Sequence, residues 1–392
     1  MVKVLFVSTI SDTVNAFLIP HIKLLVQQGN EVGIACNNSN EISPELIEIG
    51  CKTHLVEFQR VPLRKENIKA YKQIGKVVAN ENYEVVHVHT PIASFLTRLA
   101  CRHMKDIKML YTAHGFHFFK GAPKINWAIY APLEKIAARW TDCVITMNLE
   151  DYYSAMKLKV RNSDSLYRVH GVGINLQRFA PQSEEQKNHI RKAYNYKVDD
   201  FIIIYVGELS YRKHQDLLIN SIRLVGKKFS NIKLLLVGDG GYKDKYESLV
   251  TELGVEEKVE FLGYRKDIHN LMMLSDVSVS SSRQEGLPVN VMEAMATGLP
   301  LIVTNCRGNR DLVRSGENGI IVDVDDVEAF ARAIEKLYSS KELRERFSIK
   351  NKELIQLYSL PNVMKEMKDI YDKELFHTVD KKKITSNSSK LV

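Results

Sequence analysis

Several features that mark whole classes of protein are missing from this chain of 392 residues. No apolar run approaches the roughly 18 residues that a membrane-spanning helix needs, since the strongest run, residues 201–206, has six. The apolar start at residues 1–7 is too short for a secretory signal. The five cysteines are scattered and form no C-x-x-C pair, which excludes a disulfide framework and a zinc-binding cysteine motif. These absences predict a cytoplasmic protein.

The common signatures of nucleotide cofactors are also absent. No G-x-x-x-x-G-K-[ST] loop occurs, so the kinase and ATPase interpretations lack their central part. The stretch from Gly238 to Gly241 does not complete G-x-G-x-x-G, because position 243 is Lys243, and we expect no nicotinamide cofactor. An Arg-rich helix and a zinc finger are missing as well, so we expect no nucleic-acid partner.

The positive charge is concentrated in the first half of the chain. Residues 1–180 carry 22 Lys and Arg against 15 Asp and Glu, whereas residues 181–392 carry 33 against 32, within a net charge of +8. An anionic substrate or an anionic membrane surface explains such an excess.

Short apolar runs alternate with longer amphipathic ones along the chain, which is typical of parallel sheets covered by helices on both faces. We expect an α/β protein with two doubly wound, Rossmann-like domains that face each other across a cleft. The N-terminal domain is expected at residues 1–180 and the C-terminal domain at 181–359, with a polar linker near 175–200. A helix at about 360–376 packs back on the first domain, and a flexible polar tail follows at 377–392. The expected strands are 3–7, 31–35, 54–58, 85–89, 108–113 and 142–146, then 201–206, 233–237, 259–262, 277–280, 301–304 and 319–322.

The most informative segment follows the strand at 277–280 and opens a helix near Pro288. Gly286 allows a ligand to approach the backbone, and the free amides at a helix start favour a diphosphate. Glu285 and Glu293 are eight residues apart, so two carboxylates can reach different parts of one ligand. A capping acid and a solvated helix acid are the structural alternative, which the Gly-Pro context disfavours.

Glu285-x7-Glu293, within Glu-Gly-Leu-Pro and Glu-Ala-Met-Ala, resembles the nucleotide-binding signature of family 4 retaining glycosyltransferases of the GT-B fold. The resemblance covers about residues 1–375, and its N-terminal half is most similar to bacterial capsule and exopolysaccharide enzymes. It implies transfer of a sugar from a nucleotide donor, expected to be a UDP-sugar, to a lipid-linked glycan at the inner membrane surface. It also implies that no metal or other cofactor is required. Further matching segments are 111–115, 115–121, 206–209 with 212–213, 237–240 and 261–264.

The resemblance also assigns roles to individual residues. Arg212 and Lys213 would neutralise the donor diphosphate, Glu285 would contact the donor sugar, and Glu293 would accept hydrogen bonds from the ribose hydroxyls. His114, which follows the strand at 108–113, would lie beside the donor sugar. Where many relatives have an arginine near phosphate, this chain has Glu208, so Arg212 and Lys213 must supply the charge. The other expected donor-binding residues are Gly207, Gly238, Gly240, Tyr264, Arg265, Gly286, Leu287, Pro288, Asn290 and Val291.

Two further groups of residues leave their roles open. His87 and His89 are interpreted as lying on alternate faces of a strand, so we expect no metal pair from them. The aromatic segment 116–130 fits either an acceptor- and membrane-facing surface or a helix packed into the core. The candidate acceptor-side residues there are Phe116, Phe118, Phe119, Lys120, Lys124 and Trp127.

Two rival functions share this architecture. One is a non-hydrolysing UDP-N-acetylhexosamine epimerase, which needs no acceptor, and the other is a non-catalytic sugar-nucleotide-binding partner of a membrane assembly. The Glu285 and Glu293 signature favours the transferase. No acid in the chain is a clear candidate for a covalent nucleophile, so we expect a front-face route in which the donor phosphate takes the acceptor proton.

Overall fold

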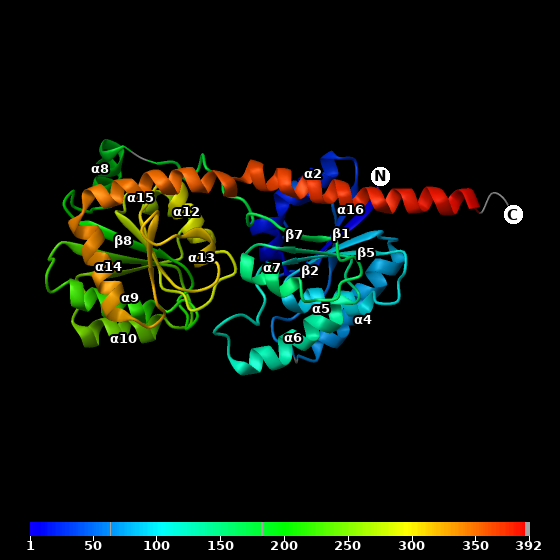
Figure 1. Ribbon diagram of the computed structural model, residues 1–392, viewed down its shortest axis with the longest axis horizontal. Coiled ribbons are helices and arrows are strands. Elements are labelled where there is room, and N and C mark those ends of the chain that lie inside the picture. Colours follow the sequence, from blue (N-terminus) through cyan, green and yellow to red (C-terminus); the bar gives the residue numbers. More distant parts are fainter. Residues whose placement is uncertain (63, 182, 389–392) are drawn as a thin grey trace. The chain divides into compact units, whose positions relative to one another are not determined.

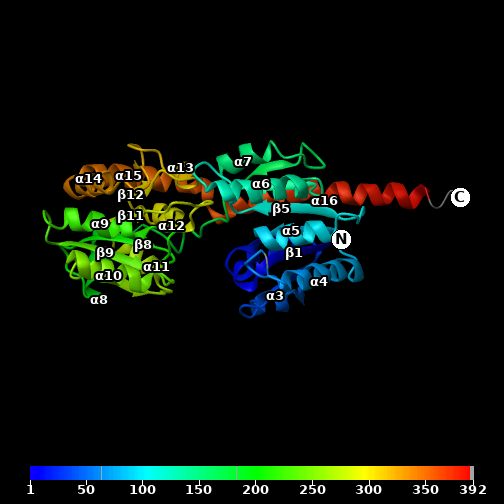
Figure 2. The same ribbon diagram turned by 90° about the horizontal axis from the view of Figure 1, so that it is seen from below.

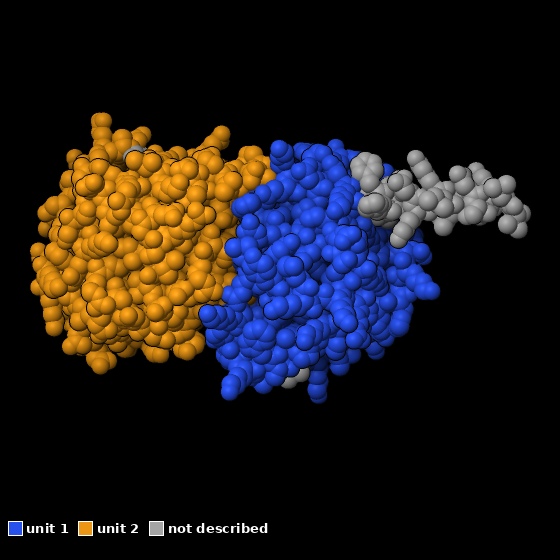
Figure 3. All heavy atoms as spheres, in the orientation of Figure 1, with its two compact units in different colours: residues 1–171, 363–392 blue, residues 172–362 orange. Residues whose placement is uncertain are grey.

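The computed structural model describes the backbone of residues 1–62, 64–181 and 183–388, and the side chains of these residues as far as Leu375. The chain divides into two compact units, 1–171 with 363–392 and 172–362 (Figure 3). The first boundary was expected at residue 180. It lies at 171/172, so the segment expected as a linker belongs to the second unit, to which the buried guanidinium of Arg191 ties it by pairing with Asp276.

The first unit contains a parallel sheet of seven strands in the order β3-β2-β1-β4-β5-β6-β7. Helices α4, α5 and α6 cover one face, and α2 and α16 cover the other (Figure 1). Figure 2 shows α4 and α5 side by side against the sheet. The elements are β1 (Lys3–Ile10), α1 (Ser11–Thr13), the π-helix η1 (Val14–Leu18), α2 (Ile19–Gln27), β2 (Glu31–Asn37), α3 (Pro44–Glu48), β3 (Lys52–Leu55), α4 (Glu66–Asn80), β4 (Val85–His89), α5 (Pro91–Ala100), β5 (Lys108–Ala113), α6 (Lys124–Ala138), β6 (Cys143–Thr146), α7 (Leu149–Ala155), β7 (Leu166–Arg168) and α16 (Leu360–Ser388).

The second unit contains a parallel sheet of six strands in the order β10-β9-β8-β11-β12-β13. Its core lies on both faces of the sheet, one against α9, α10 and α14 and one against α8, α11 and α12. The elements are α8 (Glu184–Ala193), β8 (Phe201–Val206), α9 (Gln215–Val225), β9 (Ile232–Val237), α10 (Lys243–Leu253), β10 (Val259–Gly263), α11 (Ile268–Met273), β11 (Val277–Ser280), α12 (Val289–Thr297), β12 (Leu301–Thr304), α13 (Asn309–Leu312), β13 (Gly319–Val322), α14 (Val327–Ser339), α15 (Lys341–Leu354) and the 3-10 helix η2 (Ile355–Tyr358).

Both sheets confirm the doubly wound class that the alternating runs predict. In each sheet the strand order reverses between the first strand and the fourth, at β1/β4 and at β8/β11. Loops beyond the carboxyl ends of two strands that flank such a reversal leave a crevice, which is where α/β sheets bind ligands.

Two strand predictions differ from the structure. β3 spans Lys52–Leu55 instead of 54–58. The buried Val56 and Phe58 lie beyond it, and only the backbone of Val56 still bonds to that of β2, through its amide and the carbonyl of Cys36 at 3.0 Å. The edge strand β7, Leu166–Arg168, was not expected, because three partly exposed residues leave no apolar run to detect.

The last helix ties the end of the chain to the first unit. Lys108 Nζ lies 2.7 Å from Glu374 Oε2, and the hydroxyl of Tyr167 donates to Glu374 Oε1 at 2.7 Å. Tyr371 is fully buried beside His87. Where a flexible tail was expected from residue 377, the backbone of α16 is helical to Ser388, and residues 389–392 lie outside the described part.

Candidate functional site

The reversal point of the second sheet brings together two loops that the sequence analysis singled out. One follows β8 and carries Arg212 and Lys213, and the other follows β11 and carries Glu285. The loops are joined by backbone bonds as well, since the amide of Arg283 donates to the carbonyl of Arg212 at 2.9 Å. Residues 72 or 73 positions apart therefore meet at one edge of the sheet.

The carboxylate of Glu285 binds both cations. Lys213 Nζ lies 2.5 Å from its Oε1, Arg212 Nη1 lies 3.5 Å from its Oε2, and the Ser282 hydroxyl donates to Oε1 at 2.6 Å. Burial alone would raise the pKa of the Glu285 carboxyl, but the charges of Lys213 and Arg212 and these hydrogen bonds hold that pKa below its ordinary value. The carboxylate therefore stays ionised and fixes two positive groups in place.

The two cations differ in exposure, and this difference suits them to different tasks. The Lys213 side chain is 12% exposed, whereas that of Arg212 is 43% exposed. Lys213 is therefore held as a buried fixed charge, while the guanidinium of Arg212 faces solvent with most of its donors available. Such a pair is a ready site for the phosphates of a ligand.

Glu293 lies in α12 and behaves differently from Glu285. Its carboxylate makes no hydrogen bond or ion pair with the described residues. Burial raises the pKa of Glu293 to about 7, with the charge of Arg178 acting weakly in the opposite direction. An unpaired, half-buried carboxylate is poised to accept hydrogen bonds from a ligand, because both of its oxygens are free.

The start of α12 is anchored so that its free amides are held rigidly. Pro288 occupies the N-cap in an extended conformation, and the side-chain amide of Asn290 donates to the carbonyl of Val206 at 2.7 Å. Val291 is buried and Leu287 packs at the edge of the core. The first amides of a helix have no partners inside it, and they attract anions.

The other residues that were expected to bind the donor differ in their exposure and in their contacts. A Cβ at Gly238, whose φ is +139°, would collide with the carbonyl oxygen of Gly207, and one at Gly240 would collide with that of Leu209. These glycines thus bring the loops after β8 and β9 together. Tyr264 is 76% exposed, and Arg265 forms a two-pronged ion pair with Asp267. Gly286 lies in the loop between Glu285 and α12.

Position 208 is a glutamate and adds no third cation to Arg212 and Lys213. The Glu208 carboxylate is exposed and lies 3.9 Å from the Arg212 guanidinium, close enough for a weak attraction only. Further contributors to the site were not expected from the sequence. Buried Arg307 donates to the carbonyl of Glu285 at 2.9 Å, and the Tyr205 hydroxyl lies 3.1 Å from that of Ser282. The only signal for Ser282 was its place beside Glu285 in the motif.

His114 lies in the first unit, just after β5, where it is half-buried beside His89. His87 and His89 share one face of β4, with ring centroids 4.2 Å apart, so the interpretation that they lie on alternate faces was wrong. Residues two apart in a strand point to the same side. Among the described residues, no cluster of three His, Cys, Asp or Glu side chains is arranged to hold a metal.

Most of the aromatic segment packs into the core of the first unit. Phe116, Phe118 and Phe119 are buried, so their assignment to an acceptor- or membrane-facing surface was wrong. The reason is the loop before α6, which folds Phe118 against Phe116 at a ring distance of 4.9 Å. Lys120, Lys124 and Trp127 do reach solvent, although the Trp127 indole N–H donates to the carbonyl of Phe119. No helix in the described part of the chain combines the length and the apolar character needed to cross a membrane.

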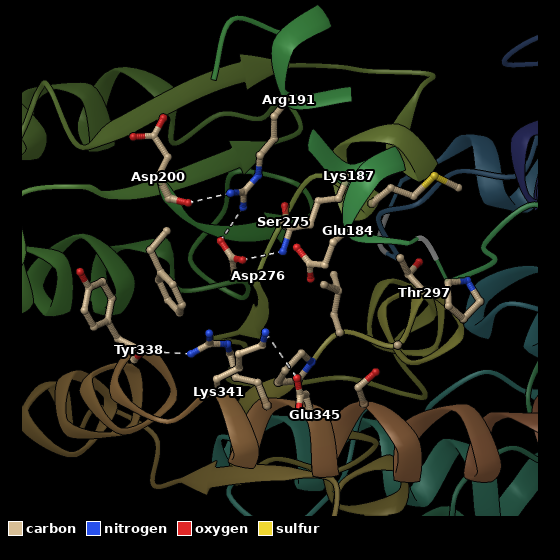
Figure 4. Close-up of a pocket in the computed structure, with 18 of the residues that line it drawn as sticks. Glu184, Lys187, Arg191, Asp200, Ser275, Asp276, Thr297, Tyr338, Lys341 and Glu345 are labelled. Carbon is tan, nitrogen blue, oxygen red and sulfur yellow. Dashed lines mark hydrogen bonds and ion pairs between the residues drawn. The ribbon is translucent and has the colours of Figure 1, made fainter. Parts of the chain in front are cut away.

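A cavity of about 790 Å³ in the second unit lies away from these residues (Figure 4). It opens at the amino ends of β8, β11 and β12, the opposite edge of the sheet from Glu285. Its central charges satisfy one another, since Asp276 binds both Lys187 at 2.6 Å and Arg191 at 2.7 Å. The cavity is therefore separate from the candidate site.

Two Rossmann-like units with this strand order, and a cation pair at the reversal point of the second, are the arrangement expected of a GT-B glycosyltransferase. The sequence matches two families, "Glycosyl transferase 4-like" over residues 3–148 and "Glycosyl transferases group 1" over residues 186–354. The chain belongs to glycosyltransferase family 4 and is a glycosyltransferase. The family predicted from the Glu285 and Glu293 motif is thus confirmed, and it favours the transferase over the epimerase.

Individual relatives match over nearly the whole chain. EpsD of Bacillus subtilis (strain 168), described as a glycosyltransferase, is 39% identical over 371 residues, which cover 94% of this chain and 96% of EpsD. The Escherichia coli UDP-Gal:alpha-D-GlcNAc-diphosphoundecaprenol alpha-1,3-galactosyltransferase is 25% identical over 363 residues, covering 89% and 90% of the two chains.

Solved structures share the fold. The crystal structure of Anabaena HepE in complex with UDP-glucose superposes with a TM-score of 0.76 and 18% identity, covering 95% of this chain and all of HepE. WaaG, a glycosyltransferase involved in lipopolysaccharide biosynthesis, superposes with a TM-score of 0.74 and 16% identity, covering 94% and 99%. These likenesses confirm the GT-B fold.

Proposed function

We propose that this protein transfers a hexose or N-acetylhexosamine from a UDP-sugar to a hydroxyl of a lipid-linked glycan, with retention at the anomeric carbon, during exopolysaccharide or capsule synthesis. The observation that carries the proposal is the ionised Glu285, which holds Arg212 and Lys213 beside the start of α12. The names of two relatives support the activity, the class of donor and the class of acceptor in this proposal. EpsD is described as a glycosyltransferase, and the E. coli relative is named for a UDP-linked donor and a diphosphoundecaprenol-linked acceptor.

The residues of the second unit suit the donor half of this reaction. Lys213 and Arg212 would neutralise the diphosphate and the charge that grows on it as the bond to the sugar breaks. The free amides of α12 would bind the same group, and Glu293 would accept hydrogen bonds from the ribose diol. In a front-face reaction the acceptor oxygen bonds to the anomeric carbon while its proton passes to the departing phosphate oxygen. Because fixed cations stabilise that phosphate, we propose that no metal is required.

Incubation of the purified protein with a panel of UDP-sugars and a diphosphate-linked lipid glycan tests the proposal. We expect one UDP-sugar to be consumed only when the acceptor is present, with release of UDP, and an unchanged rate in EDTA. The product should keep the anomeric configuration of the donor when examined by NMR. Conversion of a UDP-sugar without an acceptor would indicate an epimerase, and binding without turnover would indicate a non-catalytic partner. Either outcome would contradict the proposal.

We further propose that α6 places the first unit on an anionic membrane surface. Ile125, Ile129 and Ile136 are 61%, 45% and 42% exposed, and their spacing puts them in one stripe along the helix. Exposed Lys124 and Lys135 lie along one side of that stripe. An apolar stripe beside lysines fits the boundary between lipid headgroups and acyl chains.

Vesicle flotation measures this association. The protein is expected to float with vesicles containing phosphatidylglycerol and to stay unbound with pure phosphatidylcholine, since the lysines need an anionic surface. The double variant Ile125→Ser with Ile129→Ser should bind at least tenfold more weakly, because about 2 kcal/mol of apolar burial is lost. Ile349→Ser, which changes an isoleucine of the second unit that is 65% exposed, is the matched control. Equal binding by both variants would exclude α6 as the contact.

A further inference from the structure

Four histidines of the first unit form one cluster at the carboxyl edge of its sheet. His87 and His89 come from β4, His114 follows β5 and His21 comes from α2. His89 is 2% exposed and its ring stacks on Phe6 with an interplanar angle of 9°. Nδ1 of His89 lies 3.1 Å from Nε2 of His114. This direct contact links a buried ring to the histidine that the family resemblance places at the site.

All four rings are held neutral. Burial lowers the pKa of His21 and of His114 to about 4, and it lowers those of His87 and His89 well below the ordinary value, with repulsion between the rings adding to the effect. The other polar neighbours are neutral groups as well, namely the Thr112 and Tyr371 hydroxyls that bind His87 at 2.8 and 3.0 Å. Each ring therefore carries a single N–H at neutral pH.

A neutral pair joined by one hydrogen bond has two possible proton arrangements. If His114 donates from Nε2, His89 accepts at Nδ1 and must carry its own proton on Nε2. That atom is buried and has no hydrogen-bond partner among the described residues, so an N–H would be left unsatisfied. If His89 donates from Nδ1, its Nε2 is an unprotonated nitrogen, which leaves no buried donor unpaired. Buried N–H groups without a partner are the rarer and costlier defect.

The second arrangement also determines which ring nitrogen of His114 carries the proton. Its Nε2 accepts from His89, so its proton lies on Nδ1. That nitrogen makes no hydrogen bond with the described residues and is accessible to solvent. We propose that His89 is a positioning residue, which donates to His114 Nε2 and thereby presets His114 as an Nδ1–H donor toward an oxygen of a sugar ligand at the carboxyl edge of the first sheet. The choice of the sugar rests on the proposed function, whereas the proton arrangement does not.

This arrangement has a directly measurable signature. A neutral histidine side chain in water favours the proton on Nε2, so a fold that places it on Nδ1 of His114 enforces the less common tautomer. Long-range ¹H–¹⁵N correlation spectra of the full-length protein, labelled at histidine, report which nitrogen carries the proton. The spectrum of His114→Gln assigns the signals. We expect a protonated Nδ1 and an unprotonated Nε2 for His114 at pH 7.5, and a proton on Nε2 would overturn the proposal.

Two variants distinguish a positioning role of His89 from a general effect on the stability of the fold. His89→Leu removes the donor and should return His114 to the Nε2–H tautomer, raising the Kd for the UDP-sugar or lowering kcat by about tenfold while UDP binds as before. His87→Asn disturbs a buried histidine on the same face of β4, and there we expect a lower melting temperature but an unchanged His114 tautomer. An equal loss of activity in the two variants would overturn the positioning role. A protein with the predicted tautomer but no transfer activity would instead count against the proposed function alone.

Discussion

Replacement of Arg212 by alanine is expected to lower kcat by about 100- to 1000-fold with little change in the free energy of unfolding. The guanidinium is 43% exposed and its partner Glu285 keeps Lys213 and Ser282. A fixed cation beside a departing diphosphate stabilises the transition state more than the ground state, and loss of one such group costs about 3 to 4 kcal/mol of barrier. Steady-state kinetics with the UDP-sugar and thermal melting measure the two quantities.

Lys213→Ala should behave differently from Arg212→Ala. Lys213 is nearly buried, and its loss leaves the buried Glu285 carboxylate with the more distant Arg212 as its remaining cation and with the Ser282 hydroxyl. We therefore expect a loss of both turnover and stability, since breaking a buried ion pair by removing one partner is strongly destabilising. Arg283→Ala is the matched control for the loss of one positive charge, because Arg283 lies in the neighbouring loop after β11 but binds Asp325 at 2.7 Å. Equal kcat values for Arg212→Ala and Arg283→Ala would contradict the role of Arg212.

Replacement of Glu293 by glutamine is expected to stabilise the protein at pH 8 while weakening the binding of a UDP-sugar by about 10- to 100-fold. Burial raises the pKa of Glu293 from 4.5 to about 7, so the folded state bears the cost of an unpaired carboxylate only above that pH. The wild-type protein therefore loses stability relative to Glu293→Gln as the pH rises from about 4.5, where the unfolded chain ionises, to about 7, where the folded protein does. The loss totals about 3 kcal/mol and stays constant at higher pH. Binding weakens because a charged acceptor of two hydroxyl protons is replaced by a neutral amide.

Calorimetric titration measures the affinity for the UDP-sugar, and urea unfolding at pH 5.5 and pH 8 measures the free energy of unfolding. Wild-type affinity for the UDP-sugar, whose diphosphate stays ionised across this range, should fall about tenfold between pH 8 and pH 6 as Glu293 is protonated. Glu252→Gln, at an exposed position of α10, removes the same charge and should change neither quantity. A pH-independent difference in stability between wild type and Glu293→Gln would show that Glu293 has an ordinary pKa in the folded protein.

The sheets could be predicted closely because their strands are nearly continuous apolar runs. β8, for example, spans Phe201–Val206, as its pattern indicates, and its residues are buried up to Tyr205. Strand prediction was least accurate for segments in which burial and strand pairing do not coincide. Val56 and Phe58 look like strand residues but are buried beyond the end of β3, and β7 is an edge strand with little burial.

The aromatic segment 116–130 is a second case in which the sequence left the location of the side chains open. Phe116 and Phe118 are suited equally to a membrane surface and to a core, and composition does not distinguish the two. Only the path of the loop before α6 decides the question, by stacking one ring on the other inside the first unit. Exposure of Ile125 and Ile129 in the neighbouring helix was likewise not readable from the sequence, since isoleucine is the residue expected inside.

The sequence by itself determined the doubly wound class, the family and the residues that carry the site, because local spacing and residue type record where strands end and helices begin. Arg212, Lys213, Glu285 and Glu293 were all named from it. The tertiary structure alone decided how these groups are charged and which groups they face. Glu285 is ionised because two cations from a loop about 70 residues away bind it. The pKa of Glu293 is raised because the charge of Arg178 does not offset its burial. Electrostatic environment depends on distance in space and on burial, neither of which is written in the order of the chain.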